Sequence, residues 1–156
     1  IEWHMIGHVQ TNKVKYMAEY VSLIHGVDSL KLLQEINKQA KKHNRVIDVL
    51  LQMHIAEEET KFGLDDDELN EILNQVQNDK FQNIKIIGLM GMATFTENQD
   101  QIKKEFLHLK SIFDKLNTEQ FQPNTLSMGM SGDYKLAIDC GSTMVRIGSS
   151  IFGGRN

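Results

Sequence analysis

The sequence predicts an α/β fold in which helices cover a parallel β-sheet. Short apolar segments alternate with amphipathic segments along the whole chain of 156 residues. The apolar segments are nearly continuous, which is typical of parallel strands that are buried on both faces. The amphipathic segments repeat their apolar residues at helical spacing. Open doubly wound sheets and closed (β/α)8 barrels share this alternation, and the periodicity alone also allows a six-stranded open sheet.

Apolar spacing and end signals define the elements of the first half of the chain. Leu69, Ile72, Leu73 and Val76 fall at positions i, i+3, i+4 and i+7, which form one face of a helix. Residues that can cap a helix precede the other amphipathic segments. The expected elements are, in order, a buried strand over residues 1–7, a short helix capped by Thr11, a strand over 20–27, a helix from a cap at Asp28 or Ser29 to about residue 43, a strand over 46–55, and a helix from about 66 to 78.

The second half continues the same alternation. Ile102, Phe106, Leu109, Phe113 and Leu116 recur at alternating steps of four and three residues, which is the clearest helical pattern in the chain. The expected elements are, in order, a strand over 84–92, this helix, a strand over 125–130 that follows Pro123, a short helix over 133–140 that ends with Gly141 in the C′ position, a strand over 144–148, and a helix that begins at 149–152.

Composition limits the classes of partner. With 40% hydrophobic residues, 24% charged residues and one proline, the chain is expected to form one globular domain over residues 1–156. A net charge of −4 gives no basic surface for nucleic acid or an acidic membrane. Cys140 is the single cysteine, and no apolar run approaches the roughly 18 residues that span a bilayer. A reducing, cytoplasmic location is therefore expected.

The strongest functional signal lies in the last third of the chain. Thr125–Asp133 and Gly141–Gly153 each read as a short strand that runs into small residues at the start of a helix. Helix starts present free N–H groups and the positive end of a dipole, so two of them side by side would form an anion site. Arg146 adds one fixed cation, and Gly148 and Ser149 would let a ligand approach the backbone closely.

Four segments, Trp3–Lys13, Gly88–Met92, Ser127–Ser131 and Arg146–Gly148, resemble the pyridoxal phosphate (PLP) homeostasis protein family. Its members are single-domain relatives of the N-terminal barrel of alanine racemase, and the resemblance covers essentially the whole chain. It implies a (β/α)8 TIM barrel, here with about six β/α units and two further units upstream of Ile1. Six units of about 26 residues agree with a barrel of roughly 200 residues or a little more.

The resemblance also implies PLP as the cofactor and a set of residues that bind it. Ser131, Gly148 and Ser149 are expected to hold the phosphate, and Arg146 to face the pyridine nitrogen. Ser127 and Met128, on the strand before Ser131, complete the expected site. From the residues alone, Ser131 could be only a helix cap, Gly148 only a turn residue, and Arg146 the partner of an acidic side chain.

Other candidate residues have less specific interpretations. Lys61 could accept an aldehyde, but Glu57 four residues before it favours a solvated ion pair, and Lys13 reads as a surface lysine. The family's covalent PLP lysine is expected upstream of Ile1. His4 and His8 lack the spacing of a zinc site, so neither a metal nor a catalytic residue is expected.

Three functional hypotheses remain open at this stage. The first is a PLP carrier or buffer in vitamin B6 and amino-acid homeostasis, with PLP-dependent apo-enzymes as recipients. The second is a PLP-dependent enzyme similar to amino-acid racemases, which would need an acid–base group over the cofactor. The third is a fragment that binds phosphate weakly and has no other role. The resemblance favours the carrier.

Overall fold

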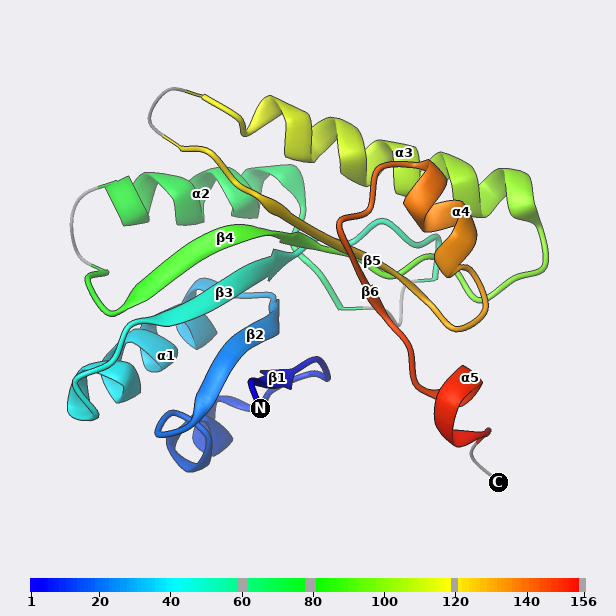
Figure 1. Ribbon diagram of the computed structural model, residues 1–156. Helices are drawn as coiled ribbons and strands as arrows, with labels where there is room; N and C mark the ends of the chain where they lie inside the picture. The colour runs from blue at the N-terminus through cyan, green and yellow to red at the C-terminus, as the bar shows by residue number, and fades with distance from the viewer. Residues whose placement is uncertain (59–61, 78–80, 119–120, 155–156) are drawn as a thin grey trace.

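A computed structural model describes residues 1–58, 62–77, 81–118 and 121–154, and in it a curved parallel sheet follows the chain order (Figure 1). Its six strands are ordered β1-β2-β3-β4-β5-β6. Every crossover therefore steps to the next strand in the same direction, whereas a doubly wound sheet reverses its order at a switch point. The sheet is thus an arc of a barrel. The strands are β1 (Trp3–Met5), β2 (Val21–Val27), β3 (Ile47–Gln52), β4 (Ile84–Met90), β5 (Thr125–Met130) and β6 (Met144–Arg146).

Helices cover the outer face of this arc (Figure 1). Apolar residues of η1 and of four α-helices pack with outward-facing strand residues in one large core, in which Leu33, Phe106 and Leu126 are fully buried. Among the described residues, no helix is long and apolar enough to cross a membrane. The helical elements are η1 (Thr11–Tyr16), α1 (Leu30–Lys42), α2 (Asp66–Gln77), α3 (Gln99–Lys115), α4 (Tyr134–Asp139) and α5 (Ser149–Phe152).

The ends of the helices follow local side-chain chemistry. The Ser29 hydroxyl accepts the Leu32 N–H at 3.1 Å, so Ser29 rather than Asp28 caps α1. Gly141 has φ of 106°, the left-handed conformation expected of a residue just after a helix. The prediction for Thr11 was wrong: η1 is a 3-10 helix, and its N-cap is Gln10, which makes no side-chain capping bond.

The first strand differs from the expectation of a buried strand over residues 1–7. β1 contains three residues, and Trp3 is 58% exposed. The physical reason is its place at the edge of the sheet, where β1 pairs with β2 alone. The long apolar segment suggested burial, but an edge position leaves much of it in contact with water.

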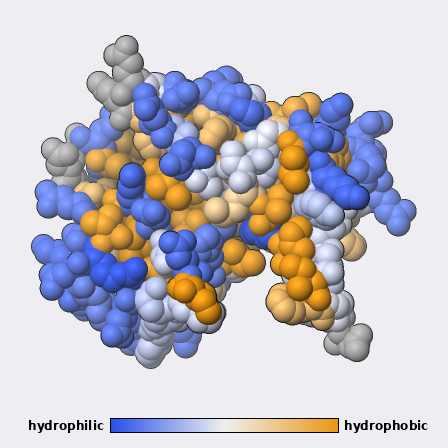
Figure 2. Space-filling view, in the orientation of Figure 1, coloured by the Kyte–Doolittle hydropathy of each residue, from blue (hydrophilic) through white to orange (hydrophobic). Residues whose placement is uncertain are grey.

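The inner face of the arc, opposite the helices, carries a second and smaller apolar cluster. Leu23, Leu50 and Met90 are buried in it, with Met92 and Met144 packed against them. Figure 2 shows the molecule hollowed on this side, between its N-terminal part and the C-terminal segment that ends in α5. Polar side chains of β2, β5 and β6 lie on the same inner face, and they lead to the candidate site.

Candidate functional site

A cavity of about 300 Å³ lies where β4, β5 and β6 end. The carboxyl edge of a barrel is where ligands bind in this class of fold. The cavity is bounded by the segment after β4, the turn after β5 and the segment after β6, which brings Ser131, Arg146, Gly148 and Ser149 together as expected. Its lining residues are Met92–Thr96, Gln99, Ile102, Gly129–Asp133, Arg146, Gly148 and Ser149.

Two backbone N–H groups converge on the Ser131 hydroxyl at one side of this cavity. Its Oγ accepts the N–H of Gly148 and the N–H of Ser150, each at 3.2 Å. A hydroxyl oxygen has two lone pairs and one proton, so the Ser131 proton remains for a further acceptor. Ser131 is therefore more than a local helix cap, because it joins the turn after β5 to the start of α5. The sequence reasoning missed Ser150, although every residue in the first turn of a helix offers an N–H.

The backbone at Gly148 leaves room for a ligand. A Cβ atom built on Gly148 would meet no heavy atom within 4 Å. Its φ of −128° is one that other residues also adopt, so the turn itself does not require glycine. Gly148 is exposed and lines the cavity, so the open space beside it fits a group that approaches the main chain.

Arg146 is a buried cation in the cavity wall. It is 6% exposed, and its Nη1 donates to the Ser127 carbonyl oxygen at 2.9 Å and to Ser127 Oγ at 2.6 Å. Its Nη2 donates to the Gly91 carbonyl oxygen at 3.1 Å. Burial lowers the pKa of Arg146 to about 10, while Asp133 acts in the opposite direction, so the guanidinium stays charged at neutral pH.

No carboxylate within the described ranges lies at salt-bridge distance from Arg146. A direct ion pair between Arg146 and an acidic side chain is therefore not found there, although the charge of Asp133 acts on Arg146 from beyond that distance. The charge of Asp133 compensates only part of the desolvation cost of this buried cation, since the pKa of Arg146 still lies below its usual value. An anionic or strongly accepting ligand in the cavity would offset part of that cost.

Two histidines on the inner face extend this polar cluster. His25 on β2 is 1% exposed, and its Nδ1 lies 3.1 Å from Ser127 Oγ. Its Nε2 lies 3.2 Å from His4 Nδ1 on β1. Burial lowers the pKa of His25 to about 4, with smaller contributions from the charges of Arg146 and His4. The sequence analysis missed His25. The signal that could have found it is the presence of a titratable residue in the middle of an apolar strand.

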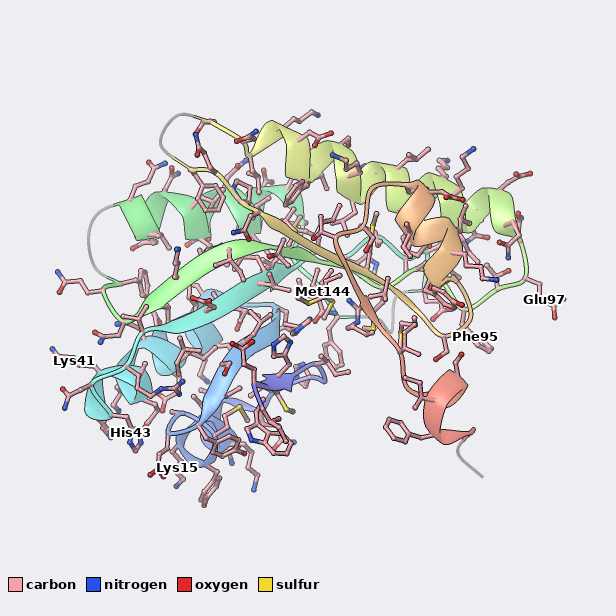
Figure 3. All side chains as sticks on the ribbon, viewed as in Figure 1. Lys15, Lys41, His43, Phe95, Glu97 and Met144 are labelled. Carbon is pink, nitrogen blue, oxygen red and sulfur yellow. The ribbon has the colours of Figure 1, made fainter. Side chains whose placement is uncertain are left out.

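The rim of the cavity is held by carboxylates. Buried Glu105 on α3 accepts the Thr94 N–H at 2.6 Å through one oxygen and the Thr94 hydroxyl at 2.7 Å through the other. Glu58 accepts the Phe95 N–H at 2.7 Å. These bonds fix the segment after β4 while the Phe95 side chain stays 93% exposed at the rim (Figure 3).

Ser127 and Met128 lie on opposite faces of β5. Ser127 is fully buried on the inner face and contacts Arg146, so it supports the cavity from behind. Met128 is also fully buried, but it belongs to the large core beneath the helices, because successive strand residues alternate between faces. The Met128 side chain is therefore turned away from the cavity.

The remaining candidate residues lie elsewhere. Lys61 is outside the described residues. Lys13 lies on the exposed surface of η1, with its Nζ 5.7 Å from the Tyr16 ring centroid. His8 Nδ1 lies 3.3 Å from an Asp28 carboxylate oxygen. Within the described parts of the chain, no group of three or more His, Cys, Asp or Glu side chains is arranged to hold a metal ion.

Comparison with known proteins identifies the family. Residues 2–156 match the model of the alanine racemase N-terminal domain. Proteins named pyridoxal phosphate homeostasis protein are 42% identical over 156 residues in Aquifex aeolicus and 36% identical over 158 residues in Pasteurella multocida. The matches cover 99% and 100% of this chain, and 68% and 67% of those relatives. The chain thus spans about two thirds of their length.

Solved structures agree with this result. PipY of Synechococcus elongatus with PLP bound has a TM-score of 0.87 and 30% identity, and the match covers 98% of this chain and 71% of PipY. An alanine racemase of Clostridium difficile has a TM-score of 0.72 at 17% identity, over 99% of this chain and 41% of the racemase, which is a likeness of fold alone. The barrel arc of the alanine racemase type is thus confirmed. The chain belongs to the alanine racemase N-terminal domain family and, within it, to the pyridoxal phosphate homeostasis proteins.

Proposed function

We propose that this chain binds pyridoxal 5'-phosphate in the cavity at the ends of β4, β5 and β6. On this proposal it acts in vitamin B6 and amino-acid homeostasis as a carrier or buffer of the cofactor. The observation that carries the proposal is the buried Arg146, which has no carboxylate at salt-bridge distance within the described residues and lines the same cavity as Ser131 and Gly148. The names of the relatives and the PLP bound to PipY support the choice of ligand.

The Ser131 side of the cavity suits the phosphate. Gly148 and Ser150 already direct their N–H groups to one oxygen atom, and Ser149 lies between them. A phosphate oxygen in the open space beside Gly148 could accept the free proton of the Ser131 hydroxyl and replace Ser131 Oγ as the acceptor of these two amides. Charge-assisted bonds of this kind are stronger than neutral ones, which suits a ligand of about −2 charge.

Arg146 suits the pyridine nitrogen. A guanidinium can only donate hydrogen bonds and does not give up its proton near neutral pH. It would therefore leave the ring nitrogen unprotonated and weaken the ring as an electron sink, which is the chemistry that PLP supplies to enzymes. This favours storage and delivery of PLP over catalysis. Ser127 would act by holding Arg146, and Met128 is left out because it packs in the large core.

The recipients would be PLP-dependent apo-enzymes. A carrier must bind its cargo firmly enough to protect it and release it without changing it. Non-covalent bonds to the phosphate and to the ring nitrogen meet both requirements, because neither alters the aldehyde of the cofactor. Transfer to an apo-enzyme can be followed by recovery of that enzyme's activity after mixing it with the loaded chain.

A binding experiment tests the proposal with pyridoxine 5'-phosphate, which keeps the phosphate and the ring but has no aldehyde to react with lysines. We expect binding by the full chain, and affinity that falls about 10- to 100-fold in Arg146→Met and Ser131→Ala, since bonds to charged groups contribute about 1.5–3 kcal/mol each. Arg45→Met is a matched control, because Arg45 donates to the carbonyl oxygens of Ala18 and Val21, away from the cavity. Equal affinity in Arg146→Met and Arg45→Met would reject the site.

A further inference from the structure

A hydrogen-bonded row of four side chains crosses the inner face of the sheet from β6 to β1. Arg146 Nη1 lies 2.6 Å from Ser127 Oγ, Ser127 Oγ lies 3.1 Å from His25 Nδ1, and His25 Nε2 lies 3.2 Å from His4 Nδ1. Ser127 and His25 are almost fully buried, while His4 lies at the exposed edge strand. The row therefore connects the cavity wall to the surface of the molecule.

The chemistry of the four groups gives this row a direction. Arg146 can only donate, so Ser127 Oγ is the acceptor in the first bond. The Ser127 hydroxyl then has one proton to place, and within the described residues its remaining hydrogen-bond partner is His25 Nδ1. If Ser127 donates to Nδ1, the proton of the neutral His25 ring is on Nε2. His25 Nε2 then donates to His4 Nδ1.

The opposite direction leaves a buried donor without a partner. If His25 carried its proton on Nδ1 and donated to Ser127, the oxygen would accept two bonds and its own proton would have no acceptor among the described residues. An unsatisfied buried hydroxyl is costly. The tautomer assigned from the network therefore has an unprotonated Nδ1 and a protonated Nε2 on His25.

We infer that His25 is a positioning residue for the cavity: its Nδ1 accepts the Ser127 hydroxyl proton and so holds the Ser127 oxygen toward the Arg146 guanidinium. Removing this acceptor frees the Ser127 side chain to rotate its oxygen away from the guanidinium. Arg146 then keeps its hydrogen bonds to the Ser127 and Gly91 carbonyl oxygens but loses its shortest bond, the one to Ser127 Oγ. Only the ligand-binding part of this inference rests on the proposed function, because the tautomer and the anchoring of Arg146 are properties of the unliganded chain.

Two substitutions of His25 separate its two ring nitrogens. His25→Asn retains an amide oxygen near the position of Nδ1 and can still accept from Ser127. His25→Gln instead places its amide near the position of Nε2. Both variants remove the ring, so a role limited to filling space would affect them alike or favour the larger glutamine. A positioning role through Nδ1 favours asparagine.

Nitrogen NMR of the full chain, without ligand, tests the inference directly. For the wild type we expect an unprotonated signal for His25 Nδ1 and a protonated signal for Nε2, and slowly exchanging Arg146 Nη protons. The Arg146 signals should persist in His25→Asn and broaden in His25→Gln and Ser127→Ala. A protonated His25 Nδ1 in the wild type would overturn the inference, and this measurement does not depend on any variant being able to fold. Identical Arg146 signals in both His25 variants would also overturn it.

Binding of pyridoxine 5'-phosphate supplies the second readout. We expect affinity to fall on the order of tenfold in His25→Gln and to stay near the wild-type value in His25→Asn. If no variant and no wild-type chain binds this ligand while the NMR pattern holds, the positioning role stands and the proposed function fails. If the wild type binds and both His25 variants bind equally, the positioning role fails and the proposed function stands.

Discussion

Lowering the pH should destabilise this protein through His25. The ring is buried beside the Arg146 guanidinium, so protonation would place a second cation in the interior of the inner face. Burial, Arg146 and His4 together lower the pKa of His25 from 6.5 to about 4 in the folded protein. The unfolded chain therefore binds this proton more readily than the folded chain between these two values.

The sign and size of the effect follow from linkage. The contribution of the neutral His25 ring to the free energy of unfolding is fully present above about pH 6.5. It falls as the pH drops toward 4 and changes no further below 4. The difference of 2.5 between 6.5 and about 4 corresponds to about 3 kcal/mol at most. Between about pH 7.5 and about pH 4.5 the loss is about 2–3 kcal/mol, a large fraction of the roughly 5–15 kcal/mol that stabilises a typical domain.

Urea unfolding at these two pH values measures this contribution. Carboxylates also titrate in this range, so the informative quantity is the difference between the wild type and His25→Asn, which has no ring to protonate. We expect the wild type to lose about 2–3 kcal/mol more than the variant on acidification. His43→Asn is the matched control, because His43 is exposed at the end of α1 (Figure 3), and it should lose as much as the wild type. Equal losses in the wild type and His25→Asn would refute the reasoning.

Three further predictions concern packing and the cavity. Gly88→Ala should prevent close pairing of β4 and β5 and cost several kcal/mol in urea unfolding, because its Cβ would clash with the Thr125 carbonyl oxygen of β5. Gly132→Ala should have little effect, because its Cβ would lie in open space. Phe106→Ala should cost about 3–5 kcal/mol, because Phe106 is fully buried, whereas Phe95→Ala should change stability by less than about 0.5 kcal/mol. Borohydride reduction of the chain with PLP should label no single lysine stoichiometrically, because no described lysine lines the cavity. If peptide mapping finds one lysine that is fully labelled, the prediction is wrong.

Most of the fold could be predicted from local patterns. The faces of α2 and α3 follow from apolar spacing, and the bounds of β5 were predicted as they are. The exposure of β1 could not be predicted, since an edge strand and a central strand can share one apolar pattern. The sequential strand order came from the resemblance to a family, because periodicity alone does not order strands in a sheet.

The candidate site was only partly accessible to sequence reasoning. Ser131, Arg146, Gly148 and Ser149 follow from two strand ends that run into small residues, which is a local signal. The contact of His25 with Ser127 joins residues 102 positions apart, and such a contact depends on how neighbouring strands bring side chains to one face. Side chains alternate between the two faces of β5, so Ser127 and Met128 cannot both face the cavity. This alternation was the available sequence signal against Met128 as a binding residue.

The proposed role of Arg146 depends on its surroundings on the inner face. The charge is a property of the side chain, but its burial and the lack of a carboxylate at salt-bridge distance in the described residues arise from the fold. Figure 3 shows Lys15 and Lys41 near the N-terminal part of the molecule, well away from Phe95 at the cavity rim. Among the described residues that line the cavity, Arg146 is the one arginine, and no lysine lies with it.

The most direct test of the central claim is a proton–nitrogen NMR titration of the full chain with pyridoxine 5'-phosphate. We predict that the backbone signals of Gly148, Ser149 and Ser150 and the Nη signals of Arg146 shift together and saturate at one affinity. Inorganic phosphate should move the three backbone signals and leave Arg146 largely unchanged, since it occupies only the Ser131 side of the cavity. Saturable shifts confined to other parts of the chain, with these four residues unmoved, would contradict the proposed site.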